Sequence, residues 1–286
     1  MATAFYNQAT LSYNGNIISS NRTEGEIIEV LSATKDALVT TYNGANDKVT
    51  YVINIVNSGT TDFTALTLSD NLGSYTAAAA TAVPLTYIDG SLKYYVNGSA
   101  QTLPTVAALS PLTITGISVP ANSNAQLIYE AFTNTYAPLA QGGSIENTAS
   151  INGTGISSTL TASQTITPAD ASNLSITKSV SPTTVAENGT LTYTFNIENT
   201  GSRAITTADD VIVSDTFNPI LDPFSVTFNG TAWTEGTNYS YSAATGAFAS
   251  LANQITVPAA SYSQNSETGE WSVSPGIATL VISGTL

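Results

Sequence analysis

Lysine, aspartate and asparagine recur on strand faces that are otherwise apolar. Successive side chains of a strand point to opposite faces, so Lys35 shares its face with the apolar residues of segment 31–37. By the same alternation, Asp70 lies on the apolar face of segment 66–72, and Asn147 faces the same way as its apolar neighbours. Buried amines and carboxylates destabilise a core unless they are paired. The pattern predicts a Lys–Asp ion pair with a hydrogen-bonded Asn, a lysine that extends to water, or three groups that react together.

A second lysine and aspartate repeat this arrangement without a following asparagine. Lys178 lies on the apolar face of segment 174–180, and Asp215 lies on the apolar face of segment 211–217. The asparagine that matches Asn147 occurs near the start of the chain, at Asn7. Its face also carries Phe5, Ala9 and Leu11. We therefore expect Asn7 to supply the missing third group.

The segments that carry these residues form an internal repeat. The stretch "KVTYVINIVNSG" (48–59) matches "TLTYTFNIENTG" (190–201), and "LTLSDNL" (66–72) matches "VIVSDTF" (211–217). "LSATK" precedes the first copy and "LSITK" precedes the second. Thr, Ser, Asn, Gly, Val, Ile and Tyr dominate the chain, which favours strands and turns over helices. The repeat predicts two copies of one all-β module.

The order "TK…TYTFNIENTG…VIVSDTF…PG…NTA" resembles the Ig-like conserved repeat of bacterial surface proteins, catalogued as domain of unknown function eleven. The resemblance covers nearly the whole chain. It implies tandem Ig-like antiparallel β-sandwich modules that serve as a surface stalk or fibre. It does not imply an enzyme.

The two modules differ in length at their ends. Module 1, over residues 26–168, continues through "GGSIENTASINGTGISSTLTASQTIT", whereas module 2, over 169–286, stops before an equivalent segment. A sandwich without its last strand exposes unpaired backbone groups and an open core. The segment 1–25 carries the missing pattern of Asn7, Ala9 and Leu11, followed by an Asn-Gly pair. We therefore interpret it as a donor strand and connector, completing module 2 by strand addition.

A second copy of the chain is the expected acceptor of the donor strand. About 10 residues connect the donor pattern to module 1, and such a link spans at most ~35 Å. Folding back past a whole module to reach module 2 is therefore difficult. Head-to-tail donation that does not close produces a filament. A side-by-side monomer that completes itself is the alternative.

The resemblance also suggests what the three polar residues do. Similar Ig-like modules of Gram-positive surface proteins carry Lys–Asn isopeptide bonds with an acid beside them. This implies a bond from Lys35 to Asn147 assisted by Asp70, and one from Lys178 to Asn7 of the next subunit assisted by Asp215. Burial favours a neutral amine and a neutral carboxyl group, so the amine attacks the carboxamide, the acid transfers protons, and ammonia leaves. The ion-pair interpretation remains open.

Composition limits the other functions. The formal charge is −14, which disfavours binding to nucleic acid or anionic membranes. The chain has no His and no Cys, which removes their acid–base, nucleophilic and metal chemistry. No apolar run approaches the ~20 residues of a membrane span. We therefore expect neither a cofactor nor a metal, and no enzymatic activity beyond autocatalytic bond formation.

The sequence thus predicts a structural subunit of an extracellular bacterial fibre on a cell or spore surface, whose partner is a copy of itself. The alternative is a surface adhesin or stalk that binds carbohydrate or a host protein without polymerising. Trp233 and Trp271 are candidates for sugar binding in that case, although such aromatic residues more often pack inside sandwiches. Asp209 and Asp210 are a weaker candidate site for Ca²⁺.

Overall fold

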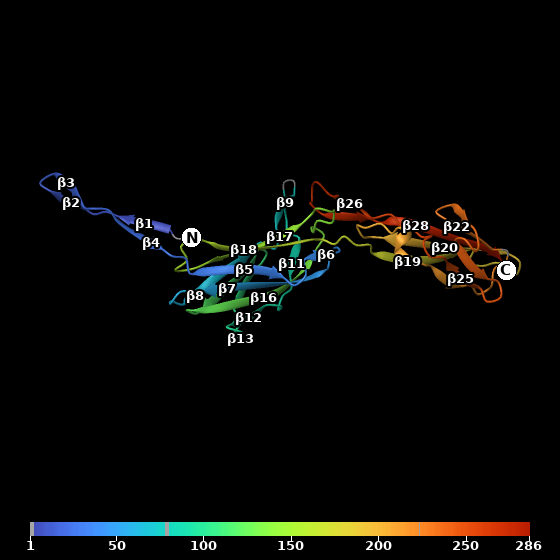
Figure 1. The fold of residues 1–286 in the computed structure, drawn as a ribbon, viewed down its shortest axis with the longest axis horizontal. Coiled ribbons are helices and arrows are strands. Elements are labelled where there is room, and N and C mark those ends of the chain that lie inside the picture. Colours follow the sequence, from blue (N-terminus) through green and yellow to red (C-terminus); the bar gives the residue numbers. More distant parts are fainter. Residues whose placement is uncertain (1–2, 78–79, 223) are drawn as a thin grey trace. The chain divides into compact units, whose positions relative to one another are not determined.

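The computed structural model describes residues 3–77, 80–222 and 224–286, and in these ranges the protein is almost wholly β. The predicted all-β class is confirmed. The helical exception is a 3-10 turn, η1 (Thr207–Asp209). The chain divides into two compact units, which Figure 1 shows in blue to green and in yellow to red. Unit 1 is Met1–Ala137 with Ser144–Thr167, and unit 2 is Pro138–Gly143 with Pro168–Leu286. The predicted module boundaries stay predictions. None of the described helices is long and apolar enough to cross a membrane.

Unit 1 contains two six-stranded sheets. The first has the order β13 (Ser99–Ala100), β12 (Lys93–Val96), β16 (Ser123–Thr133), β7 (Lys48–Asn57) and β5 (Leu31–Ala37), with β11 (Leu85–Tyr87) also on β16. The second has the order β14 (Thr105–Leu109), β15 (Leu112–Val119), β8 (Phe63–Asp70), β17 (Ile145–Asn152), β18 (Leu160–Pro168) and β6 (Thr41–Tyr42). A small additional pair consists of β9 (Tyr75–Ala77) and β10 (Ala80–Ala82).

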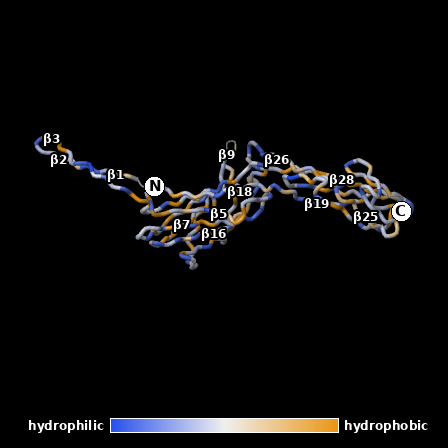
Figure 2. The backbone as a smooth tube through the Cα atoms, viewed as in Figure 1, coloured by the Kyte–Doolittle hydropathy of each residue, from blue (hydrophilic) through white to orange (hydrophobic). Residues whose placement is uncertain are grey.

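The core of unit 1 lies between these sheets because their strands alternate buried and exposed residues. Every second residue of β7 is fully buried, and the same holds for most of β16, which pairs with it along ten residues. Hydrophobic residues concentrate on these strands in Figure 2. The buried hydrophobic members of β7 are Val49, Tyr51, Ile53 and Ile55. Burial of such side chains stabilises a fold by about 1.5–3 kcal/mol each.

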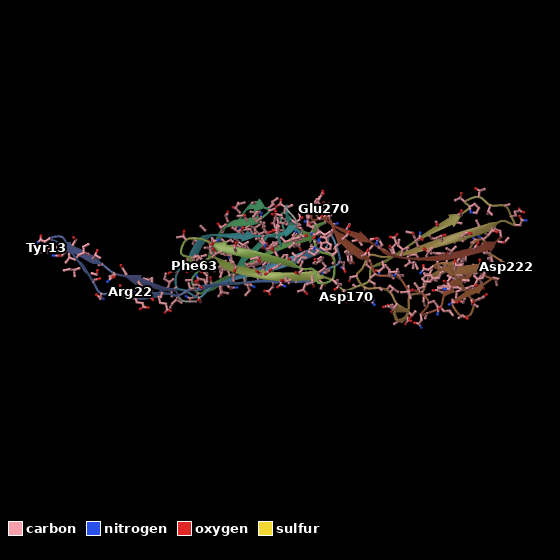
Figure 3. All side chains as sticks on the ribbon, turned by 90° about the horizontal axis from the view of Figure 1, so that it is seen from above. Tyr13, Arg22, Phe63, Asp170, Asp222 and Glu270 are labelled. Carbon is pink, nitrogen blue, oxygen red and sulfur yellow. The ribbon has the colours of Figure 1, made fainter. Side chains whose placement is uncertain are left out.

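The N-terminal segment of unit 1 forms a hairpin that packs against no core. Strand β1 (Thr3–Asn7) pairs with β4 (Thr23–Ile27), and β2 (Thr10–Tyr13) pairs with β3 (Asn16–Ser19). The Asn14-Gly15 turn between them has positive φ at both residues, as tight hairpin turns require. Tyr13, at the tip of the hairpin, exposes 69% of its surface (Figure 3). The sequence predicted a single donor strand, but Asn14-Gly15 reverses the chain and creates two arms. Met1 and Ala2 of the predicted segment lie outside the described residues.

Unit 2 repeats part of this architecture. A five-stranded sheet has the order β19 (Leu174–Ser181), β20 (Thr190–Asn199), β28 (Gly276–Thr285), β22 (Phe224–Phe228) and β23 (Thr231–Trp233). A three-stranded sheet has the order β21 (Ser214–Thr216), β25 (Ala247–Ser250) and β24 (Tyr239–Ser242). Strands β26 (Ser261–Gln264) and β27 (Trp271–Ser274) form a further pair. β20 pairs with β28 as β7 pairs with β16.

One predicted strand of unit 2 is shorter than expected. Segment 211–217 was predicted to be a strand throughout, but only Ser214–Thr216 is one. In unit 1 both β15 and β17 pair with the equivalent stretch of β8. In unit 2, β21 pairs only with β25 among the described strands. Residues 211–213 lie outside the strand, and of these the Val213 carbonyl accepts a backbone hydrogen bond of 2.9 Å from Ser250 at the end of β25.

Candidate functional site

In unit 1 a lysine and an aspartate meet across the core. Lys35 on β5 and Asp70 on β8 come from opposite sheets, and Lys35 Nζ lies 2.7 Å from Asp70 Oδ2. Neither side chain exposes any surface. Both side chains therefore point into the core, as strand alternation predicted. A pair buried this completely is strongly coupled, and removing either partner leaves an uncompensated charge.

Tyr129 connects Asn147 to this ion pair. Strand β17 lies beside β8, with Ala149 opposite Asp70, so that Asn147 enters the same part of the core. The Asn147 amide Nδ2 donates to the Tyr129 hydroxyl at 2.9 Å, and this hydroxyl donates to Asp70 Oδ2 at 2.7 Å. The structure thus brings the three predicted residues of unit 1 into one hydrogen-bonded chain. The amide oxygen Oδ1 of Asn147 is buried without a hydrogen-bond partner among the described residues.

The role of Tyr129 was missed from the sequence. The alternation of β16 places it inward, and its ring stacks on that of Tyr51 at a centroid distance of 5.4 Å. The sequence therefore did contain a signal for Tyr129, because alternation places this tyrosine on the inward face of β16 among small and aliphatic residues. Its partners come from two other strands, and strand alternation does not show which residues across a core are in contact.

Burial changes the acidity of these groups. Desolvation lowers the pKa of Lys35 to about 8, although the neighbouring Asp70 opposes this shift. Desolvation also raises the pKa of Tyr129 well above its ordinary value, with Asp70 adding to the shift. The tyrosine is therefore a neutral donor at physiological pH. A lysine pKa of about 8 leaves roughly a tenth of the amine uncharged at pH 7. Neutral amine is the nucleophilic form.

Unit 2 contains the same ion pair, but it is open to water. Lys178 Nζ contacts Asp215 Oδ2, and the two side chains expose 39% and 19% of their surfaces. Nζ still lies over apolar rings, 4.6 Å from the ring centroid of Tyr193. The counterpart of Tyr129 is Ile282, because each lies opposite the matching tyrosine of the neighbouring strand. Unit 2 therefore provides no hydroxyl at this position.

A groove lies beside the exposed pair. It is lined by residues of β19, of β20 and of the irregular segment before β21: Leu174, Ser175, Ile176, Ile197, Val211, Ile212 and Val213. All eight residues of β19 are exposed, whereas its counterpart β5 is partly or fully buried on its inner face. Ile176 exposes 52% of its surface. The part of unit 1 that β17 covers is thus an uncovered apolar edge in unit 2.

The predicted donor residues are exposed in the hairpin. Phe5 and Leu11 expose 52% and 63% of their surfaces, and Ala9 and Asn7 are exposed as well. Asn7 lies opposite Thr23, whose hydroxyl donates to the Asn7 carbonyl at 3.1 Å. Asn7 and Lys178 belong to different units of the chain. The predicted Lys178–Asn7 contact therefore stays a prediction.

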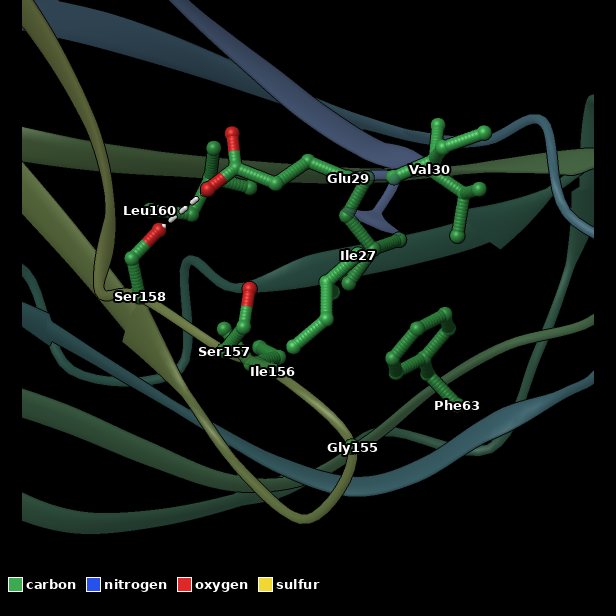
Figure 4. Close-up of a pocket in the computed structure, with 11 residues that line it drawn as sticks. Ile27, Glu29, Val30, Phe63, Gly155, Ile156, Ser157, Ser158 and Leu160 are labelled. Carbon is green, nitrogen blue, oxygen red and sulfur yellow. Dashed lines mark hydrogen bonds between the residues drawn. The ribbon is translucent and has the colours of Figure 1, made fainter. Parts of the chain in front are cut away.

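A small pocket of about 70 Å³ lies where the hairpin joins the sandwich of unit 1 (Figure 4). Glu29 is the carboxylate among its lining residues, and its Oε1 accepts from the Ser158 hydroxyl at 2.5 Å. The hydroxyl lowers the pKa of Glu29. Glycoside hydrolysis requires two carboxyl groups. The residues that line this pocket include only one.

Asp209 and Trp233, two of the other candidates, make contacts within unit 2. The Asp209 carboxylate accepts from the Thr206 backbone and from Arg203, and these bonds lower its pKa to about 2. The described residues contain no group of three or more acidic, His or Cys side chains able to hold a metal ion. Trp233 stacks on Phe228 at a centroid distance of 5.1 Å. This tryptophan is thus part of the packing of unit 2.

No family model and no curated protein matches the chain. It is similar to the pilus backbone protein RrgB of Streptococcus pneumoniae, at 10% identity and a TM-score of 0.35, over 86% of this chain and 55% of that one. It also matches a family 123 glycoside hydrolase of Clostridium perfringens at 10% identity and a TM-score of 0.28. This match covers 48% of this chain and 27% of the hydrolase chain. BcpA, the major pilin subunit of Bacillus cereus, matches at 10% identity and a TM-score of 0.34. This match covers 96% of this chain and 73% of the BcpA chain. The chain spans about half the length of the first structure. All three TM-scores lie below 0.5, so these likenesses carry no argument about function.

Proposed function

We propose that this chain is a structural subunit of an extracellular bacterial fibre, in which the N-terminal segment of one copy completes unit 2 of the next. One observation carries the proposal. The Lys35–Asp70 pair of unit 1 is sealed in a core that β17 helps to close, whereas the equivalent Lys178–Asp215 pair is open beside an apolar groove. The missing strand pattern occurs elsewhere in the same chain, on the exposed strands β1 and β2.

The exposed apolar residues support a partner for both surfaces. The hairpin and its continuation expose Phe5, Tyr6, Leu11, Tyr13, Ile17, Ile18, Ile27 and Ile28. The edge of unit 2 exposes Leu174, Ile176, Val180 and Ile212. Clustered exposed apolar residues mark interaction sites more often than plain surface, and unpaired strand edges accept additional strands. Strand addition would cover the apolar residues of the hairpin and those of the unit 2 edge in one interface, and it would pair the open strand edge.

The register of the proposed pairing follows from unit 1. Ala149 lies opposite Asp70 and Ile151 opposite Leu68. In unit 2 this places Ala9 of the donor opposite Asp215 and Leu11 opposite Val213. Asn7 would then enter the core at the position that Asn147 has in unit 1, beside Lys178 and Asp215.

Isopeptide bonds would make this fibre covalent. In each case the bond between lysine Nζ and the asparagine carboxamide carbon forms while the bond from that carbon to Nδ2 breaks, and ammonia leaves. The aspartate accepts the proton from the amine and delivers one to the leaving nitrogen. Lys35, Asp70 and Asn147 would form the bond within unit 1. Lys178, Asp215 and the Asn7 of a neighbouring copy would form the bond between subunits. The described contacts of unit 1 support the first of these bonds, and the second depends on strand donation.

Electron microscopy tests the fibre proposal. The purified full-length chain should form long thin fibres in negative stain, and deletion of residues 1–23 should leave dispersed particles. Adding the deleted segment as a peptide should protect the edge of unit 2 without restoring fibres. Dispersed full-length particles at every concentration would favour a non-polymerising stalk or adhesin. Fibres of the truncated chain would rule out donation by this segment. Placement on a spore surface stays a prediction from the sequence.

A further inference from the structure

The part of unit 1 that has no counterpart among the described strands of unit 2 is a hairpin of two strands. Strand β17 pairs with β8 on one side and with β18 on the other, and β18 continues the sheet to β6. A backbone hydrogen bond of 2.9 Å from Thr167 to the Thr40 carbonyl joins β18 to the segment that leads into β6. Replacing β17 alone would therefore leave the sheet unfinished.

Unit 2 has a second gap at the position that corresponds to β6. Counting along the repeat from Lys35 and Lys178, Thr40 corresponds to Thr183 and Tyr42 to Val185. Tyr42 is buried on a strand, whereas residues 182–185 form no strand and only Val185 is partly buried. Exposed backbone of this kind is available for pairing.

The N-terminal hairpin repeats the pairing of β17 with β18. Asn147 lies opposite Gln164, and Asn7 lies opposite Thr23. Further along, Ile151 lies opposite Leu160 in unit 1, and Leu11 lies opposite Ile18 in the hairpin. The ladder of β17 and β18 is unbroken from Asn147 to Ile151, whereas the hairpin has one extra residue on its second arm between the partners of Asn7 and Leu11. The pairing of β1 with β4 therefore has the register of the missing element, and the pairing of β2 with β3 is displaced from it by one residue.

Packing at the base of the hairpin supports the same equivalence. In unit 1 the residues opposite each other are Ile145 and Ile166, both buried. In the hairpin they are Phe5 and Gly25, and a Cβ added to Gly25 would lie 2.3 Å from Phe5 Cζ. The Phe5 ring therefore occupies the space above the glycine. The pair of Phe5, which has a large ring, and Gly25, which has no side chain, thus stands where unit 1 has two isoleucines.

The two faces of the hairpin differ in polarity. By strand alternation Phe5, Asn7 and Gly25 share one face, and Tyr6, Glu24 and Glu26 share the other. The Arg22 guanidinium lies 3.6 Å from the Tyr6 ring centroid. The charged face suits contact with water, and the Phe5 face suits a core. This polarity matches β18, whose residues alternate between buried and exposed.

We infer that the donor is the whole hairpin of residues 3–27, which docks as one element on unit 2 of a second copy of this chain. Strands β1 and β2 extend the sheet from β21, while β4 pairs with segment 183–185 as β18 pairs with the segment before β6. The backbone N–H of Glu26 then donates to the Thr183 carbonyl, as Thr167 donates to Thr40. This inference rests on the proposed function and specifies its partner surface.

Cysteine pairs test the two arms separately, because the chain has no cysteine of its own. Thr10→Cys with Ser214→Cys reports the first arm, and Glu26→Cys with Thr183→Cys reports the second. Each pair is made as two single variants, one of them isotope-labelled, which are mixed, assembled and oxidised. Peptide mapping then identifies which cysteines are joined and whether they come from different copies. Glu26→Cys mixed with Thr231→Cys, on the edge strand of the other sheet, is the control and should not crosslink.

We expect intermolecular disulfides from both test pairs. Crosslinking of the Thr10–Ser214 pair alone would overturn the hairpin inference and leave strand donation intact. Failure of both pairs would overturn the proposed function as well. Variants that carry both cysteines of a pair on one chain test whether a chain can complete its own unit 2. Crosslinks in these variants but not in the mixtures would identify a chain that completes itself, which contradicts both proposals.

Discussion

The hydroxyl of Tyr129 lies 2.9 Å from Asn147 Nδ2 and accepts its hydrogen bond. Because the same hydroxyl donates to Asp70, it connects the amide to the carboxylate by accepting one hydrogen bond and donating the other. The amine of Lys35 contacts the same carboxylate oxygen, Oδ2, at 2.7 Å. The four groups form a connected polar set inside an apolar core, where electrostatic interactions are stronger than in water.

The first prediction concerns the bond within unit 1. The intact mass of the purified chain should be lower than the sequence mass by one ammonia, and Lys35→Ala or Asp70→Ala should abolish that deficit. A Lys35–Asn147 bond closes a loop of roughly 110 residues and should stabilise unit 1 by about 4–5 kcal/mol, less any strain. Lys48→Ala is the matched control, since Lys48 pairs with Glu130 at the surface. An unshifted mass in the wild-type chain would rule this bond out.

The second prediction concerns Tyr129 as a positioning residue. Tyr129→Phe keeps the ring but removes the hydroxyl that holds the Asn147 amide, so bond formation after refolding should slow while the fold is retained. Time-resolved mass spectrometry measures the rate. Tyr87→Phe is the control, because the Tyr87 hydroxyl is buried without a partner among the described residues and its ring lies 6.1 Å from that of Tyr129. Equal rates in the two variants would show that the hydroxyl is not used.

The third prediction concerns pH. The neutral amine attacks, and its fraction rises with pH until the pKa of Lys35, which burial lowers to about 8. Formation of the bond after refolding should therefore accelerate from pH 6 to 8 and level off above. An unperturbed lysine would be neutral roughly 200- to 300-fold less often at pH 7, and its rate would still be rising at pH 9. A rate that does not change between pH 6 and 8 would contradict attack by this amine.

The fourth prediction concerns the bond between subunits. Wild-type fibres should resist boiling in detergent, whereas Asn7→Ala fibres should assemble and then fall to monomers under the same treatment. The apolar anchors Phe5 and Leu11 remain in this variant, so strand pairing is retained. Gln8→Ala is the control, because Gln8 lies between β1 and β2 and its carboxamide Nε2 donates to the Ser20 carbonyl at 2.7 Å within the hairpin. If wild-type fibres dissolve to monomers, the covalent part of the proposal fails and only non-covalent donation survives.

The fifth prediction tests the packing of Phe5 on Gly25. Gly25→Ile places a side chain where the Phe5 ring lies, so assembly should be lost. The double variant Phe5→Ile with Gly25→Ile reproduces the Ile145–Ile166 pair of unit 1 and should restore assembly. Sedimentation of fibres measures both. Loss of assembly in the double variant but not in Gly25→Ile would show that the two residues do not act as a pair.

Strand alternation and the internal repeat determined much of this protein from the sequence alone. Because strand side chains alternate with a period of two, Lys35, Asp70 and Asn147 lie on the apolar face of their strands however the sheets pack. The repeat assigns Lys178 and Asp215 to the same positions in unit 2. Both signals are local or depend on matching one stretch of the chain with another. They therefore predicted the polar cluster of unit 1 and the all-β class without knowledge of the packing.

Only the tertiary structure decided how these residues are satisfied. Tyr129 joins Asp70 to Asn147 because three strands from two sheets meet at one point of the core. The difference in exposure between Lys35 and Lys178 depends on whether a neighbouring strand covers the sheet edge. The two-armed hairpin is local by contrast, because the Asn14-Gly15 pair is itself a tight-turn signal and adopts positive φ at both residues. Burial and cross-sheet contact depend on what packs against a strand, and the residues of that strand do not encode its neighbours.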